Sequence, residues 1–528
     1  MLRRADGLVA AGIFLVSLAV YVRTLAPSVA EMFDDSLEFQ LIASRMAIAH
    51  PTGYPLFSIL LKLFSLLPVG DIAFRVNLMA ALFAGLAAAV VYLAARQLVA
   101  SRSAAFCAAL VFAFGPTFWS QANLVEVYSL QALLTAGLLW LALAWGRTQA
   151  VNSTPGPRVV RVLNRPFTIS NFPSLAVLAF VAGVSLTHHR MSVLLLPALA
   201  VYVLTYDRSV IFKPRVLLGT AVAFLLPLLI YLYLPVRGLV TSSLDGTYQN
   251  SLSGFLGWVM GASYGVFITG NPFKEEREGI YFLNLFLAQF TWPGLIMAAA
   301  GLVALFRRAW REALLLALAL AANLAFALTY RVADIDVFFI PSFLISALLL
   351  AAGLDLLARL RLSAFSREGT ESDAASAPAA DFRDRWSARL AHRVPPGLNR
   401  IIAAAPVLVL AFLLIPAWLV SANWTGLDLA GKWDVLDYGK DLLGPPLPAN
   451  ATIIGLGGEV SLIQFVQDNY GLRREVATVR ADTEPERLDA IASALGAGRS
   501  VFLTRPLAGA PKQYSLQSFG PLVEVQAQ

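Results

Sequence analysis

Long uninterrupted apolar runs recur from the N-terminus of this chain to beyond residue 415. Each run approaches the roughly 20 residues that a helix needs to cross about 30 Å of hydrocarbon. None of them alternates in polarity as the strand of a membrane barrel would. The pattern therefore predicts an all-α polytopic membrane bundle of about 11–12 spanning helices. The expected spans lie near residues 8–22, 74–95, 103–120, 128–146, 173–187, 191–206, 216–235, 281–306, 312–330, 338–358 and 400–420.

A shorter apolar segment at residues 54–68 is expected to be re-entrant or interfacial. If it does not cross, the basic residues of the connecting segments all fall on the same side of the bundle as Arg3. The positive-inside rule makes that side cytoplasmic, so we expect the N-terminus inside and the loop 24–73 outside. These basic residues are Arg96, Arg102, Arg147, Arg158, Arg161, Arg165, Arg208, Lys213, Arg215, Arg307, Arg308, Arg311 and those of the stretch 359–400.

Composition supports this class and limits the partners. The chain of 528 residues is 58% hydrophobic and 14% charged, whereas soluble domains average about 25% charged residues. Arginines that set the topology explain the formal net charge of +7, so we expect a lipid bilayer and no nucleic acid as partner. The single Cys107 lies in an apolar run and indicates no disulfide. The excess of Arg over Lys is typical of a GC-rich genome and predicts a bacterial inner or plasma membrane.

Two domains are predicted, a membrane domain at residues 1–420 and an extracytoplasmic α/β domain at residues 421–528. The stretch 362–398 is rich in Ser, Ala, Arg and Asp without apolar periodicity, and is expected to be a mobile cytoplasmic loop. In the second domain Val460 occupies the third glycine position of a dinucleotide-binding fingerprint, so no nucleotide site is expected. Its expected elements are strands at 451–456, 475–480 and 500–504, and helices at 459–469 and 484–495.

The first external loop carries the densest group of ionisable residues. Asp35 and Glu38 lie three residues apart, so a helix beginning there would place both on one face. One interpretation is structural, with Asp35 as the N-cap and Glu38 at the third helical position. The other is catalytic, because carboxylates near hydrocarbon are costly, tend to be functional and have raised pKa values suited to a general base.

Further polar residues gather at the outer ends of other spans. His188, His189 and Arg190 would form either an interfacial turn or a site for a phosphate at the headgroup level, although adjacent helical residues point about 100° apart. The loop 236–280 is long enough to cover a site as a lid. A belt of interfacial aromatics explains Tyr128 but not its neighbour Glu126. The other outer residues are Asp34, Arg331, Asp334 and Asp336.

Two motifs of the first loop resemble a known family. The run from Asp35 to Glu38 and the run from His50 to Pro55 resemble the Asp-Ser-Gly-Glu and His-Pro-Pro-Gly-Tyr-Pro motifs of a polytopic membrane family that includes the animal protein O-mannosyltransferase. Leu37 and Thr52 depart from the pattern but leave the acids, the histidine and the Gly-Tyr-Pro turn in place. The resemblance spans about residues 8–350 and includes Trp119, the run 126–128 and the pair 188–189.

The resemblance implies a glycosyltransferase of the GT-C superfamily that takes a sugar from a polyprenyl phosphate. A first-loop carboxylate, Asp35 or Glu38, would deprotonate an acceptor hydroxyl of a protein, lipid or envelope glycan and invert the anomeric centre. No cofactor is certain, and a divalent metal is possible but not required. Donor and phosphate contacts would come from His50, Tyr54, His188, His189, Arg190 and Arg331, and acceptor or supporting contacts from Asp34, Glu126, Tyr128, Asp334 and Asp336.

Three other functions remain open from the residues alone. A transporter or flippase of lipid-linked sugars should show internal repeats and polar or broken helices at the bilayer midplane, and the sequence shows no repeated halves. A ligase that joins a preassembled glycan to an acceptor would use a similar outer site. A non-catalytic scaffold would use the C-terminal domain for docking.

Overall fold

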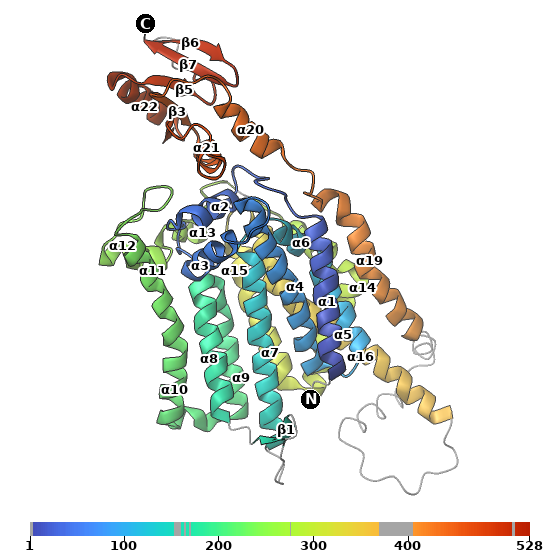
Figure 1. The fold of residues 1–528 in the computed structure, drawn as a ribbon. Coiled ribbons are helices and arrows are strands. Elements are labelled where there is room, and N and C mark those ends of the chain that lie inside the picture. The colour runs from blue at the N-terminus through green and yellow to red at the C-terminus, as the bar shows by residue number, and fades with distance from the viewer. Residues whose placement is uncertain are drawn as a thin grey trace.

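The computed structural model describes residues 4–152, 160–162, 165–167, 171–274, 276–368, 405–508 and 513–527 of the chain. Helices run side by side as a bundle, and a small α/β region stands on one end of it (Figure 1). The predicted fold class, a helical membrane bundle with a small C-terminal α/β part, is therefore confirmed.

Most of the predicted spans are single long helices. Within the described ranges, seven helices are long and apolar enough to cross a membrane. In hydrocarbon, a helix satisfies the hydrogen bonds of its backbone within its own segment. They are α1 (Arg4–Arg23), α4 (Ile72–Leu98), α7 (Tyr128–Asn152), the run through α10 (Pro214–Leu225), η3 (Leu226–Leu232) and α11 (Tyr233–Arg237), α14 (Gly279–Arg308), α15 (Trp310–Thr329), and the run through η5 (Ile335–Phe339) and α16 (Ile340–Glu368).

Other apolar helices are shorter or bent. The predicted span 103–120 is a pair, α5 (Arg102–Phe114) and α6 (Pro116–Asn123), bent by 61°. Pro116 causes this break, because proline begins a helix well but cannot continue one. The segment 54–68 forms α3 (Pro55–Ser65), beside α2 (Asp35–Arg45) at one end of the bundle (Figure 1). The remaining predicted spans are α8 (Asn171–His188), η1 with α9 (Arg190–Leu195, Leu196–Tyr206) and α19 (Ala405–Leu427).

The loop 236–280 contains helices that the sequence did not predict. They are α12 (Leu252–Val259), η4 (Ala262–Gly265) and α13 (Val266–Thr269), and α12 meets the following pair at an angle of 46°. Outside these, η2 (Arg208–Phe212) and the hairpin of β1 (Val160–Val162) and β2 (Arg165–Phe167) lie at the opposite end of the bundle. Most of the stretch predicted to be a mobile loop, 362–398, lies outside the described residues.

Two buried carboxylates hold basic residues together at the end of the bundle that carries the N-terminus. Asp6 accepts hydrogen bonds from Arg96 and Arg102 at 3.0 and 2.9 Å. Asp355 pairs with Arg308 and Arg359 at 2.9 and 2.7 Å, and also accepts from the amides of residues 100 and 101. Arginines that lie far apart in the sequence therefore meet at one end, as the charge pattern predicted.

The C-terminal region has a five-stranded sheet in the order β4-β3-β5-β7-β6. The strand β3 pairs in parallel with β4 and β5, with Ile453 opposite Thr478 and Phe502. Its core strands and two helices match the prediction closely, but α20 (Asp434–Leu443) and the antiparallel hairpin of β6 (Tyr514–Phe519) and β7 (Leu522–Ala527) were missed. The predicted elements are β3 (Ala451–Gly455), α21 (Gly457–Tyr470), β4 (Ala477–Arg480), α22 (Glu484–Gly496) and β5 (Ser500–Leu503).

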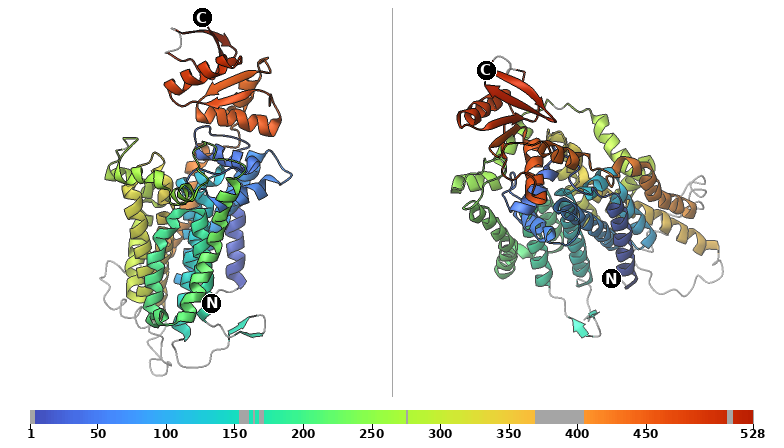
Figure 2. Two further views of the ribbon diagram at one scale, coloured as in Figure 1. Left: turned by 90° about the vertical axis from the view of Figure 1, so that its left-hand side faces the viewer. Right: turned by 45° about the horizontal axis from the view of Figure 1, so that its top comes forward.

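This region packs directly on the first loop (Figure 2). Leu37 and Leu41 of α2 share one buried apolar cluster with Leu462 and Phe465 of α21. Arg45 extends the contact, because its guanidinium binds Asp468 at 2.5 Å and Gln464 at 2.7 Å. The helix α2 is therefore held between the bundle and the C-terminal region. The predicted division at residue 420 falls inside α19 and stays a prediction.

Candidate active site

The helix α2 presents two carboxylates on one side. Asp34, in an extended conformation, caps the helix by accepting a hydrogen bond from the amide of Asp35 at 2.6 Å. The structural interpretation of the sequence placed the cap one residue later, at Asp35. Because Asp34 takes that role, the Asp35 side chain is not needed as a cap. Asp35 and Glu38 then occupy the first turn, where the helix dipole favours negative charge.

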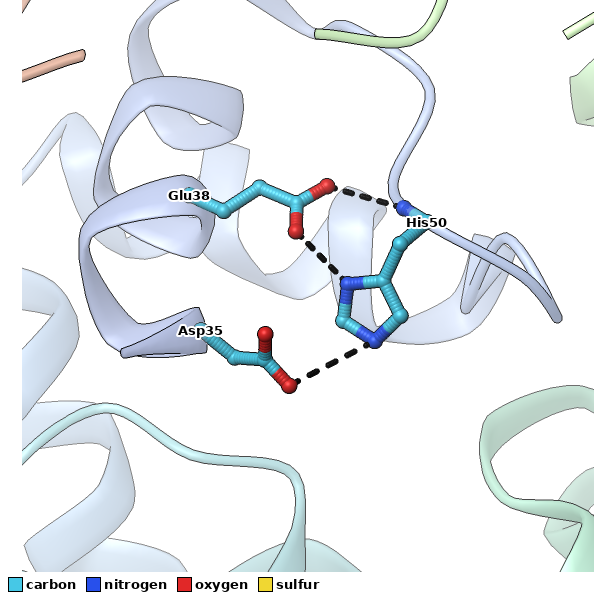
Figure 3. Close-up of side chains that lie close together, drawn as sticks. All are labelled: Asp35, Glu38 and His50. Carbon is cyan, nitrogen blue, oxygen red and sulfur yellow. Dashed lines mark hydrogen bonds and ion pairs between the residues drawn. The ribbon is translucent and has the colours of Figure 1, made fainter. Parts of the chain in front are cut away.

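The turn after α2 brings His50 back to these carboxylates, as Figure 3 shows. Glu38 accepts a hydrogen bond from the His50 amide at 2.8 Å through Oε1, and from His50 Nδ1 at 2.6 Å through Oε2. The other ring nitrogen, Nε2, lies 3.6 Å from Oδ2 of Asp35. Both oxygens of Glu38 are thus occupied by His50, whereas the Asp35 side chain is 58% exposed.

The electrostatics of this group favour a charged histidine and a basic aspartate. Burial by itself would lower the pKa of His50, but the carboxylates of Glu38 and Asp35 outweigh it and raise the pKa to about 9. Desolvation in its recess raises the pKa of Asp35 to about 6, although the nearby His50 opposes the rise. At neutral pH, a deprotonated Asp35 therefore faces a protonated imidazole.

Two further acids from distant parts of the chain approach α2. Glu126 precedes α7, is 6% exposed and has one carboxyl oxygen, Oε1, without a hydrogen-bond partner in the described structure. Burial, followed by the charges of Asp34 and Asp35, raises the pKa of Glu126 well above its usual range. Asp334 accepts a hydrogen bond from Tyr128 at 3.5 Å, and its charge also raises the pKa of Asp35.

The three residues His188, His189 and Arg190, at the end of α8, do not point to one place. His188 is buried and its Nε2 donates to the Val127 carbonyl at 2.8 Å. His189 accepts a hydrogen bond from the amide of Met191 through Nδ1 at 3.3 Å and so caps η1. The Tyr54 ring lies between these histidines and His50, 5.1 Å from the His50 ring and 6.0 Å from that of His189. The assignment of phosphate contacts to this group stays a prediction.

The Arg190 guanidinium goes elsewhere, toward the loop 236–280. A β-carbon placed on Gly261 would lie 3.0 Å from Arg190 Nη1. Gly261 has φ +57°, a conformation that glycine adopts without strain, and the close approach of Arg190 leaves no room for a side chain. Arg190, one of the phosphate contacts predicted from the sequence, therefore lies against the predicted lid.

The outer loop 331–336 is fixed to the segment before α14. The Arg331 amide donates to the Phe267 carbonyl at 2.9 Å, and Tyr281 donates a hydrogen bond to Asp336. Arg277 donates to the carbonyls of residues 332 and 333 at 3.0 and 2.7 Å. Asp336 is therefore a structural partner of Tyr281. Asp334 of the same loop is one of the acids whose charge acts on Asp35.

Sequence reasoning missed Asp245, which lies in the loop 236–280. Its carboxylate accepts hydrogen bonds from Ser243 and from the amide and hydroxyl of Thr247. The charge of Asp245 is also one cause of the raised pKa of His50, which places it near the site. The available signal was the Asp245-Gly246 pair, which is typical of a turn and gave no reason to expect a functional position.

Asp35, Glu38 and His50 also offer one ligand atom each within 4.8 Å of one another. Two carboxylates and an imidazole are suitable ligands for a divalent transition metal. A cation would compete with the hydrogen bond between Glu38 and His50, and the imidazole would have to lose its proton. The residues therefore permit a metal without requiring one.

The fold and the carboxylate group at its end define a membrane protein with the architecture of GT-C glycosyltransferases. ArnT from Cupriavidus metallidurans bound to undecaprenyl phosphate has a TM-score of 0.58 and 16% identity, over 99% of this chain and 97% of that one. AglB, an archaeal oligosaccharyltransferase from Archaeoglobus fulgidus in complex with an inhibitory peptide and a dolichol-phosphate, has a TM-score of 0.51 and 13% identity, over 94% and 69% of the two chains. At these identities the likeness is one of fold.

Residues 35–211 match the family model described as the protein O-mannosyl-transferase TMEM260 N-terminal domain. The mouse protein O-mannosyl-transferase TMEM260 is 30% identical over 266 residues, which cover 48% of this chain and 34% of the relative. The Dictyostelium discoideum protein of the same name is 26% identical over 303 residues, covering 55% and 35%. The chain thus spans about a third of the length of these curated relatives. The resemblance predicted from the first loop is confirmed.

Proposed function

We propose that this protein transfers a sugar from a polyprenyl-phosphate donor to a hydroxyl acceptor at the membrane surface. The observation that carries the proposal is the exposed carboxylate of Asp35, 3.6 Å from His50 Nε2, at the first position of the segment that matches the O-mannosyl-transferase family model. A fold shared with ArnT, whose structure holds undecaprenyl phosphate, supports a lipid-linked donor.

Asp35 is the better candidate for the general base. Its carboxylate is exposed and its pKa of about 6 is close to working pH, which is where a base combines sufficient ionisation with sufficient basicity. Both oxygens of Glu38 are held by His50, so a proton transfer to Glu38 would cost these hydrogen bonds. Glu38 then acts as the positioning residue, which orients His50 toward Asp35.

The reaction follows from these roles. Asp35 accepts the proton of the acceptor hydroxyl while the hydroxyl oxygen forms a bond to the anomeric carbon of the donor sugar. The bond between the anomeric carbon and the phosphate oxygen breaks, and its electron pair stays on the phosphate. Attack opposite the leaving group inverts the anomeric centre. Arg190 and Arg331 are the candidates that would stabilise the departing phosphate.

The site would face away from the cytoplasm. The carboxylate group and the C-terminal region lie at the end of the bundle opposite the N-terminus (Figure 1). The arginines paired with Asp6 and Asp355 lie at the N-terminal end, which the positive-inside rule assigns to the cytoplasm. The acceptor would then be a hydroxyl group of a protein, a lipid or an envelope glycan on the outer face.

The test is sugar transfer from a panel of synthetic polyprenyl-phosphate sugars by the purified protein in detergent, with and without EDTA. We expect Asp35→Asn to lower kcat by about 10²–10⁴-fold, the usual contribution of a general base. Glu38→Gln should reduce kcat less, because Asp35 remains. Asp34→Asn should keep most of the activity at neutral pH, because asparagine caps a helix as well as aspartate does and Asp35 stays ionised there.

The outcomes separate the candidate functions. Consumption of a donor by the wild type and its loss in Asp35→Asn support the transferase and its base, and loss with EDTA adds a metal. If no donor is consumed but labelled donor crosses liposomes that contain the protein, the transporter or flippase replaces the transferase.

A further inference from the structure

A cavity of about 560 Å³ opens beside His50. One wall is the turn of His50 and Pro51, and the other is the segment 245–264 of the loop 236–280. Its volume lies within the range of about 300–1,000 Å³ that small-molecule sites occupy. Neither the family match, which ends at residue 211, nor the first-loop motifs assign a role to the second wall.

The two walls are joined firmly. The indole of Trp258 donates a hydrogen bond to the Ala49 carbonyl at 3.0 Å, and Ile48 forms a β-bridge with Ser243. Beneath them, Ile48, Tyr248 and Trp258 share a buried apolar cluster with residues 231 and 234. The cavity is therefore a formed part of the fold and does not depend on closure of the loop.

The lining has the composition of a site for an uncharged polar ring. Asp245, Thr247, Gln249 and Ser263 offer carboxylate, hydroxyl and amide groups, while Trp258 and Tyr264 add aromatic surface. Hydroxyls of a ligand can be bound by the first set, and the apolar face of a pyranose ring can pack against the second. The lining includes no Lys or Arg, and the charge of its His50 is already paired with Glu38, so a phosphate would find no free counter-charge within it.

Asp245 is set up as a fixed hydrogen-bond acceptor. Partial burial would raise the pKa of Asp245, but hydrogen bonds from Ser243 and Thr247 outweigh it and hold the pKa below its usual value. Its carboxylate accepts three hydrogen bonds from these two residues. A carboxylate has about four acceptor positions, so one remains for a ligand hydroxyl.

Two glycines of α12 line the cavity, and one of them borders open space. Gly254 and Gly257 lie three residues apart, on one face of this helix, and both line the cavity. A β-carbon on Gly257 would meet no atom within 4 Å. The space beside Gly257 is therefore open, and a larger side chain there would fill it without displacing protein atoms.

We infer that this cavity is a subsite for the uncharged sugar ring of a substrate, placed so that the ring lies against His50. The inference rests on the proposed glycosyl transfer and names where the sugar binds. The ring belongs either to the lipid-linked donor or to a glycan acceptor. Arg190 lies against Gly261, which precedes the lining residue Ala262, and there it would meet a phosphate attached to the ring; this position favours the donor.

The test fills the subsite. Gly257→Leu places a side chain in the open space. Gly265→Leu is the matched control: Gly265 lies in the same loop, 236–280, and also has no atom within 4 Å of an added β-carbon, but it does not line the cavity. We expect kcat/KM to fall by about tenfold or more in Gly257→Leu and to stay near the wild-type value in the control. Thermal unfolding in detergent checks that both variants fold.

Kinetics with each substrate varied in turn distinguish the two sources of the sugar. A raised KM for the donor alone assigns the cavity to the donor sugar, and a raised KM for a glycan acceptor alone assigns it to the acceptor. Unchanged kinetics in Gly257→Leu overturn the subsite while leaving the transferase intact.

A binding measurement keeps the subsite testable if no donor is consumed. Saturation-transfer NMR with methyl glycosides of the common hexoses would be recorded for the wild type and both variants. Binding that Gly257→Leu loses and Gly265→Leu retains supports a sugar subsite even if the transferase fails. No binding to the wild type, together with no turnover, overturns both.

Discussion

His50 organises the residues around it, since it takes up both oxygens of Glu38 and leaves its second ring nitrogen facing Asp35. The charges of Asp34 and Asp334 raise the pKa of Asp35, and the charges of Asp34 and Asp35 raise that of Glu126. The result is a carboxylate that is ionised at neutral pH but has a higher pKa than an aspartate fully surrounded by water.

The pH dependence of transfer should report these two groups. Below about pH 6 we expect kcat/KM to fall about tenfold per pH unit, because protonated Asp35 cannot accept the acceptor's proton. Above about pH 9 a second decline should follow, as His50 loses its charge. The measurement is kcat/KM across this range with a donor that is itself stable there.

Two variants should move the acidic limb in opposite directions. His50→Gln removes a positive charge that lowers the pKa of Asp35, so the limb should shift to higher pH and the alkaline decline should vanish. Asp34→Asn removes a negative charge that raises this pKa, so the limb should shift to lower pH. An acidic limb that stays in place in both variants would show that another group is the base.

At the scale of elements, α2 is the helix on which the site depends, and it is held from two sides. Its apolar face is buried with α21, while its carboxylates face the turn of His50. Arg237 adds a third attachment, because it donates to the carbonyls of residues 45 and 46 at the end of α2. The position of the candidate base therefore depends on contacts made far from it.

Arg45→Met should test this coupling. Arg45 is about a third exposed, so we expect its loss to cost only about 1 kcal/mol of stability. The displacement of α2 should nevertheless lower kcat by up to about tenfold with little change in KM, because small misplacements of a catalytic group are costly. Arg499→Met is the control, since the guanidinium of Arg499 donates to the Asn450 carbonyl within its own region. Equal kinetics in both variants would show that α2 is held without the C-terminal region.

At the scale of the whole molecule, the C-terminal region completes the end of the bundle that carries α2. Leu37, Leu41 and Val29 of the first loop are buried in the same cluster as the core of this region. Tyr470 donates to Asp71, the residue that caps α4, at 2.9 Å. Loss of the region would expose apolar surface next to the site.

Gly458→Val should loosen this docking. A β-carbon on Gly458 would lie 2.4 Å from the Met32 carbonyl oxygen, which is backbone and cannot move aside without displacing the first loop. Overpacking of this kind costs about 1–3 kcal/mol. We expect a lower Tm in detergent and faster proteolytic cleavage between α19 and α20. Gly496→Val is the control and should behave as the wild type, because a β-carbon on Gly496, at the end of α22, would meet no atom within 4 Å. Equal cleavage in the two variants would contradict the docking.

The sequence by itself determined the class of protein and much of its local structure. Length and polarity of the apolar runs are local properties, so they predicted the helices α1, α4 and α16 without knowledge of their neighbours. The capping box at Thr483 and Glu486 is local too and is present at the start of α22. The pair of Asp35 and Glu38 on one helix face followed from spacing alone, as did the family resemblance.

The tertiary structure decided which of these residues meet. Glu38 takes up His50, Glu126 and Asp334 join the acidic group, and His188 turns into the core, although sequence spacing gave all of them similar weight. The cavity beside His50 requires residues near 50 and near 257, and α2 requires α21. These contacts join segments up to about 430 residues apart, and they depend on which apolar faces pack together, which no local pattern specifies.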